Sequence, residues 1–185
     1  RSGYQGQVDA YRDAHQWKEA TTAAAVAAKA QPKDSATQLM YAGQLADTGK
    51  VDQGIALAKA QLSSKAGAPE DRDAYLALTQ IYTRLKRWQD ASSALDSAAA
   101  VSVKPEEKLY VYFLRGVLAD RQKHYDEAET EFHKALAIDP QNATILNYLG
   151  YMLADRGVKL PEALTMIQKA VQLDPQNGAY LDSLG

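Results

Sequence analysis

A fixed spacing of bulky, small and proline residues recurs along the chain. Trp17, Ala20, Ala24, Ala27 and Pro32 are three, four, three and five positions apart. The same separations recur in Tyr125, Ala128, Phe132, Ala135 and Pro140, and in Leu160, Ala163, Ile167, Ala170 and Pro175. Less regular copies are Trp88, Ala91, Leu95 and Ala98 with Val103 in place of proline, and Val51, Gly54, Ala58 and Gln61. The copies start at residues 17, 51, 88, 125 and 160, so they are 34, 37, 37 and 35 residues apart, a period that indicates a repeat solenoid.

Each copy is predicted to form a helix, because steps of three and four keep side chains on one helical face and a following proline ends the helix. A second helical pattern precedes each copy, for example Leu146, Leu149 and Leu153. Each repeat is therefore predicted to be a pair of antiparallel helices. Gly49 and Gly157 lie where the first helix of a pair stops and the chain reverses.

Residues near the predicted helix ends agree with this pairing. Pro105, followed by Glu106 and Glu107, suits a first helical turn. Asp139 and Asp174 are predicted to cap the helices that follow the nearby prolines.

This signature resembles that of the tetratricopeptide repeat family, in which a bulky, a small and a second bulky residue mark the first helix. In that frame the repeats are 1–34, 35–71, 72–108, 109–142 and 143–177, and the first helix of a sixth begins at Gly178. The resemblance implies an all-α fold: an α-solenoid, wound as a right-handed superhelix of antiparallel helix pairs, forming one domain over residues 1–185. Thr79, Arg115, Gly54 and Gln61 depart from the pattern, so looser packing is expected around them.

Composition excludes several classes of function. The net charge of −2 provides no basic field for nucleic acid, which also disfavours an RNA reader of the similar pentatricopeptide type. The absence of cysteine excludes disulfides, thiolate metal sites and a cysteine nucleophile. No apolar run approaches the roughly 20 residues of a membrane helix, so no membrane insertion is expected.

Residues that carry chemistry are sparse. His15, His124 and His133 have no metal-ligand spacing around them, and the acidic run at 126–131 is typical of a solvated helix face. Six of the eleven tyrosines fall on packing positions of the repeat, which favours a core role. We therefore predict no catalytic, metal or cofactor site, and a protein that is not an enzyme.

The resemblance implies that exposed faces of the first helices line one concave ligand groove. Its candidate residues are Leu39, Leu76, Gln80, Arg84, Phe113, Val117, Arg121, Asn147 and Tyr151. The apolar ones form a stripe outside the packing positions, predicted to be partly exposed and to bind a protein segment. The alternative is that Phe113 and Tyr151 pack against each other across adjacent helices.

One well-known form of this groove uses Lys and Asn to hold a terminal carboxylate. The matching places in this sequence are occupied by Gln5, Asp9, Leu39, Gly43, Leu76 and Gln80. That clamp is missing, so the sequence favours an extended or helical partner segment with apolar side chains.

The predicted function is a protein–protein interaction scaffold, and the alternative is a recruiting or regulatory arm of a larger enzyme or envelope assembly. The chain begins with Arg1 and ends within a repeat signature, so we expect a fragment of a longer protein. The stretch 146–185 is similar to bacterial repeat proteins, some of them exported, which favours the cell envelope over the cytoplasm. Leu181 and Leu184 are predicted to dock the last helix while its other side stays bare, and we expect weak self-association through this C-terminal edge.

Overall fold

The described part of the chain is helical. The computed structural model describes residues 2–13 and 16–185, without the side chains of residues 2–5 and 13. The predicted positions at Gln5 and His15 therefore lie outside the described side chains. Within the described ranges there are eleven α-helices, one short 3₁₀ helix and no strand.

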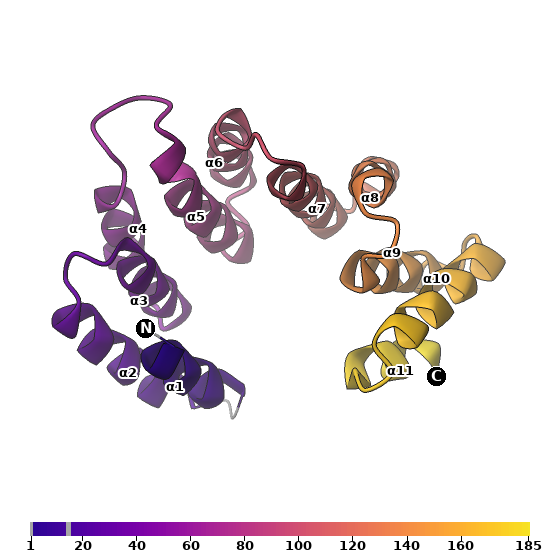
Figure 1. Cartoon of the computed structure of the whole chain (residues 1–185), viewed down its shortest axis with the longest axis horizontal. Coiled ribbons are helices and arrows are strands. Elements are labelled where there is room, and N and C mark those ends of the chain that lie inside the picture. The colour runs from indigo at the N-terminus through magenta and orange to yellow at the C-terminus, as the bar shows by residue number, and fades with distance from the viewer. Residues whose placement is uncertain (1, 14–15) are drawn as a thin grey trace. The chain divides into compact units, whose positions relative to one another are not determined.

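The helices follow one another in pairs joined by short turns (Figure 1). They are α1 (Ser2–Asp13), α2 (Trp17–Ala30), α3 (Ser35–Asp47), α4 (Val51–Ala60), the 3₁₀ helix η1 (Pro69–Asp71), α5 (Arg72–Arg84), α6 (Trp88–Ala100), α7 (Pro105–Arg121), α8 (Tyr125–Ile138), α9 (Ala143–Asp155), α10 (Leu160–Leu173) and α11 (Gly178–Leu184). The predicted repeat starts at 35, 72, 143 and 178 are the first residues of α3, α5, α9 and α11. Helix α7 begins at Pro105, about one turn before the predicted start at 109, as the Pro-Glu-Glu sequence indicated.

The chain divides into two compact blocks, residues 1–102 and 103–185. The N-terminal block contains α1 to α6, and the C-terminal block contains α7 to α11. In both blocks the first and second helices of a pair pack on each other.

The turn between paired helices requires one residue in the left-handed region. Gly49 and Gly157 have φ of 88° and 67°, which confirms the reversal predicted there. The same place in the turns after α5 and α7 is taken by Lys86 and Lys123, with φ of 58° and 63°. A lysine adopts this conformation at a cost that glycine avoids.

Two helix caps differ from the prediction. Asp139 and Asp174 do not cap α9 and α11; the Asn142 side chain accepts from the Ile145 N–H at 3.1 Å, and the Asn177 side chain accepts from the Ala179 N–H at 3.1 Å. The helices start three residues past the prolines, out of reach of the aspartates. The Asp139 carboxylate instead accepts from the Gln141 N–H two residues on, at 3.1 Å.

Small residues set the distance between paired helices. A Cβ on Gly150 would lie 2.8 Å from Ile167 Cγ1 and 2.9 Å from the Ala163 carbonyl oxygen. A Cβ on Gly116 would lie 2.5 Å from the ring of Phe132, and Ala128 is fully buried. Such distances leave no room for a larger side chain.

The expectation of loose packing is wrong at Gly54. A Cβ there would lie 2.5 Å from the Ala42 carbonyl oxygen and 3.0 Å from the Ala46 nitrogen, so α3 and α4 approach closely because this residue is glycine. Thr79 is also buried, and its hydroxyl donates to the Tyr75 carbonyl at 2.8 Å.

Helix α11 is held by a residue other than the two predicted. Tyr180 is buried against Leu146 and Ala170, and its hydroxyl shares a hydrogen bond of 3.0 Å with Thr144 Oγ1. Leu181 and Leu184 are exposed, so the prediction that they dock the helix is wrong. They occupy the repeat positions that pack on the second helix of a pair, and the described chain places no helix there.

A buried glutamine on α3 has no polar partner. Gln44 is 0% exposed, and neither its amide nitrogen nor its amide oxygen has a hydrogen-bond partner in the described part of the chain. The same position is apolar in the third, fourth and fifth repeats, where it is occupied by Ile81, Leu118 and Met152. An unsatisfied buried polar group costs about 1 to 3 kcal/mol.

We expect Gly150→Ala to lower the free energy of unfolding by about 1 to 3 kcal/mol, because the added methyl group must displace Ile167 or the α10 backbone. Urea unfolding followed by circular dichroism measures this loss. Gly178→Ala is the matched control, since nothing lies within 4 Å of a Cβ at Gly178. Equal effects of the two substitutions would contradict the proposed contact.

Replacement of Gln44 by methionine should raise the free energy of unfolding by about 1 to 3 kcal/mol, since it removes two unsatisfied polar atoms and keeps the side-chain length. Thermal and urea unfolding check the sign. Gln38→Met is the control with the opposite sign, because the buried Gln38 amide donates to the carbonyls of Ala28 and Gln31 at 2.9 and 3.1 Å. A destabilised Gln44→Met chain would mean that Gln44 has a polar partner.

Candidate functional site

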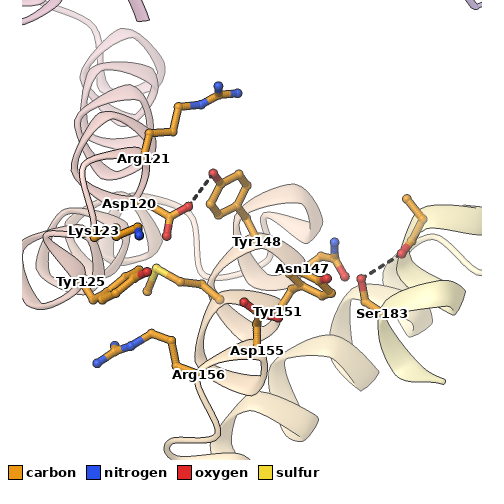
Figure 2. Close-up of a pocket in the computed structure, with 12 residues that line it drawn as sticks. Asp120, Arg121, Lys123, Tyr125, Asn147, Tyr148, Tyr151, Asp155, Arg156 and Ser183 are labelled. Carbon is orange, nitrogen blue, oxygen red and sulfur yellow. Dashed lines mark hydrogen bonds between the residues drawn. The ribbon is translucent and has the colours of Figure 1, made fainter. Parts of the chain in front are cut away.

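A pocket of about 540 Å³ opens on the C-terminal block. It lies on the side of α7, α9 and α11, the first helices of successive pairs, and the chain from Lys123 to Tyr125 closes one end (Figure 2). The lining residues are Asp120, Arg121, Lys123, Tyr125, Asn147, Tyr148, Tyr151, Met152, Asp155, Arg156, Ala179 and Ser183.

Aromatic rings form the support beneath the pocket. Tyr148 on α9 meets Phe113 on α7 edge-on, with ring centroids 5.8 Å apart and planes at 90°. Its ring also lies 5.1 Å from that of Phe132, which packs against Gly116. Edge-to-face contacts of this kind add to the free energy of burial.

A hydrogen bond ties α7 to α9 at this point. The Tyr148 hydroxyl donates to Asp120 Oδ2 at 3.1 Å, as Figure 2 shows. Burial raises the pKa of Tyr148 to about 12, and the negative charge and hydrogen bond of Asp120 act in the same direction, while Arg121 opposes them. Tyr148 is therefore a neutral donor at physiological pH, and Asp120 is held as its acceptor.

The rim of the pocket is polar. The Arg156 guanidinium lies over the Tyr125 ring, 4.4 Å from its centroid, so this cation is stabilised by the ring face. Ser183 Oγ donates to the Ala179 carbonyl within α11 at 2.9 Å. Tyr151 projects from α9 and is 54% exposed.

Among the described residues that line the pocket, only Asn147 has a side-chain atom that is buried without a hydrogen bond. Its side-chain oxygen, Oδ1, is out of contact with solvent and has no donor in the described part of the chain. A buried amide oxygen without a donor is destabilising, and a rotation of the Asn147 side chain that brings this atom to the pocket surface would let it accept a hydrogen bond.

The predicted groove residues of the C-terminal block gather at this site. Arg121, Asn147 and Tyr151 line the pocket, and Phe113 and Val117 lie half-buried against the core beside it. The alternative contact between Phe113 and Tyr151 does not form; Phe113 packs on Tyr148 instead. The predicted exposure of an aromatic side chain is thus right for Tyr151, while Phe113 supports the site from below.

In the N-terminal block the predicted apolar stripe is absent from the described surface. Leu39 and Leu76 are 9% and 7% exposed, so the expectation that they face solvent is wrong. The helices that carry them, α3 and α5, contact each other directly, and side chains at this position are covered.

Charged side chains close the corresponding face of this block. Arg84 Nε lies 2.9 Å from one oxygen of Asp47, and the Arg12 guanidinium lies 3.4 Å from the other. Gln80 is exposed beside them. Arg84, a predicted groove residue, is therefore occupied in an ion pair within the chain.

Several pocket residues were not among the predicted candidates: Lys123, Tyr125, Tyr148, Met152, Arg156, Ala179 and Ser183. Tyr125 packs against the core, as its place in the repeat signature predicts, and it also presents its ring face to Arg156. The available signal for Tyr148 was its place one turn before Tyr151 on the same helix.

The remaining chemistry-bearing residues do not gather. Within residues 2–13 and 16–185, no three His, Asp or Glu side chains are grouped so that they could hold a metal ion. His124 and His133 are exposed and lie 3.7 Å from Glu127 and Glu129. None of the helices in the same ranges combines the length and apolar character needed to cross a bilayer.

Comparison with known proteins identifies the repeat type. The tetratricopeptide repeat model matches residues 109–142, the boundaries predicted for the fourth repeat. No curated protein sequence matches the chain.

Solved structures of similar fold cover nearly the whole chain. TTC0263, a thermophilic tetratricopeptide repeat protein of Thermus thermophilus, is 21% identical, with 98% of each chain covered and a TM-score of 0.71. A structure of MamA MSR-1 is 25% identical over 94% of this chain and 95% of that one, with a TM-score of 0.54. MamA from Desulfovibrio magneticus RS-1 is 16% identical over 95% of each chain, with a TM-score of 0.59.

The raised pKa of Tyr148 predicts a loss of stability in alkali. Because the folded state keeps this proton up to about pH 12 and the unfolded state releases it near pH 10, the contribution is complete below pH 10 and is lost as pH rises toward 12. Tyr148→Phe should therefore flatten the fall in unfolding free energy over this window, measured by urea unfolding at several pH values.

Asp120→Asn provides the coupling test, because it removes the negative charge that helps to raise the pKa of Tyr148. We expect the last tyrosinate absorbance step of the folded chain to move to lower pH in this variant and to disappear in Tyr148→Phe. An unchanged last step in both variants would assign it to another tyrosine.

Proposed function

Because this chain is a tetratricopeptide repeat protein, we propose that it is a scaffold that binds a segment of another protein in the pocket of α7, α9 and α11. Solenoid repeats build extended binding surfaces from equivalent faces of successive repeats. The observation that carries the proposal is the buried Asn147 Oδ1, which has no donor in the described chain.

A polypeptide segment supplies the donor that Asn147 needs. An extended segment offers a backbone N–H at every residue, and those groups are unpaired before binding. After a rotation of the Asn147 side chain that exposes Oδ1 to the pocket, a hydrogen bond from one of them would remove the cost of an unsatisfied acceptor. The free chain would thus carry a strain of about 1 to 3 kcal/mol that the bound segment relieves.

An apolar side chain of the segment is the second element of the proposed contact. Tyr151 exposes its ring beside Met152, and the pocket volume of about 540 Å³ is within the usual range of ligand sites. An aromatic anchor that becomes covered on binding commonly contributes about 2 kcal/mol or more. The rings of Tyr148 and Phe113 pack edge to face below the pocket and join α9 to α7.

Asn147→Ala should change stability and binding in opposite directions. The free energy of unfolding should rise by about 1 kcal/mol, because the unsatisfied acceptor is gone and alanine favours the helix. Affinity for a peptide should fall, because its backbone N–H loses the acceptor. A peptide selected on the whole chain from a random phage-displayed library, followed by calorimetric titration, measures the affinity; thermal unfolding measures the stability.

For Tyr151→Ala we expect a loss of about 2 kcal/mol in binding of the same peptide, with the fold unchanged. Leu164→Ala is the matched control, since Leu164 is 48% exposed on α10 and does not line the pocket. Selected peptides that bind Tyr151→Ala, Asn147→Ala and the parent chain equally would refute the proposed site.

A further inference from the structure

We infer that the pocket takes a segment with one acidic and one basic side chain, the acid at Arg121 and the base at Asp155. This inference rests on the proposed function and specifies the chemistry of the segment. It comes from a comparison of the same repeat positions in the two blocks.

The last residue of each first helix is charged from the second repeat to the fifth. Asp47, Arg84, Arg121 and Asp155 end α3, α5, α7 and α9. In the N-terminal block the acid of α3 and the base of α5 form a salt bridge, with Arg84 Nε 2.9 Å from Asp47 Oδ1. Side chains at this position can therefore neutralise each other between adjacent first helices.

The equivalent pair in the C-terminal block stays open. Arg121 and Asp155 both line the pocket, and among the described residues neither forms a salt bridge. These two charges therefore lie on the α7 and α9 sides of the pocket lining.

Side-chain size between the helices accounts for the difference. The α5 position that corresponds to Tyr148 is Ala77, and the α3 position that corresponds to Phe113 is Leu39. A small and an aliphatic residue let α3 and α5 come into contact. Two aromatic rings packed edge-on occupy the same place between α7 and α9, and the pocket lies above them.

The other charges of the pocket are already engaged within the chain. Asp120 accepts the hydrogen bond of Tyr148, and Arg156 lies on the face of Tyr125. Lys123 is exposed near Arg121 and adds positive charge at that end. The open charges are thus positive on the α7 side and negative on the α9 side, and a complementary ligand presents the opposite order.

The ligand also presents an apolar residue to Tyr151, which lines the same pocket and is 54% exposed.

The test is a selection with a random peptide library displayed on phage, panned in parallel on the whole parent chain and on its Arg121→Asp variant. From the parent chain we expect peptides that depend on Tyr151 and carry one acid and one base. From Arg121→Asp we expect the acidic position to become basic. Lys108→Asp is the control with the same charge change, on an exposed α7 residue outside the pocket.

A synthetic parent-selected peptide then gives the magnitude. Its affinity should fall about fivefold on Arg121→Asp, as for a partly exposed ion pair, and stay unchanged on Lys108→Asp. A version with the acid replaced by lysine should prefer Arg121→Asp to the parent chain. Asp155→Arg should produce the mirror result at the basic position.

The outcomes separate this inference from the proposed function. Peptides that require Tyr151 but show no paired charges, or whose charges do not follow Arg121→Asp, overturn the inference and leave the groove function intact. Peptides that bind independently of Tyr151 and Asn147 overturn both. Peptides whose charge preferences change with the substitutions at Arg121 and Asp155 support the inference.

Discussion

Close approach of two helices at small residues is the constraint on which the rest of this structure depends. Glycine at 54, 116 and 150 and alanine at 128 lie where a larger side chain would meet backbone or ring atoms. Each pair can bury one face of its first helix only because these contacts are short. The opposite faces of the first helices remain available to build a site, and their side chains can vary from repeat to repeat.

The two blocks use that freedom in different ways. In the N-terminal block, Leu39 is covered and the ion pairs around Asp47 fill the face of α3 and α5. In the C-terminal block, the rings of Tyr148 and Phe113 pack edge to face, and the pocket that contains the unsatisfied Asn147 amide oxygen lies above them. The same helix-pair frame therefore supports a closed face and an open one, depending on a few side chains between neighbouring first helices.

The sequence predicted the helix pairs well, because the steps of three and four residues, the prolines and the turn glycines act within one helix or one turn. It failed where contacts join helices of different pairs. The burial of Leu39 and Leu76 depends on how closely first helices approach, which local spacing does not specify. Tyr148 was overlooked for the same reason: its role comes from Phe113, Phe132 and Asp120 on other helices.

The ion pairs that join α1, α3 and α5 through Asp47 also make one part of the chain responsive to dissolved salt. Charges at a partly exposed site are screened as ionic strength rises, whereas contacts between aromatic rings are little affected. Concentrated salt should thus loosen the face of the N-terminal block and leave the support beneath the pocket rigid. The first-helix faces of the two blocks, although built from the same repeat, should therefore respond differently to a rise in ionic strength.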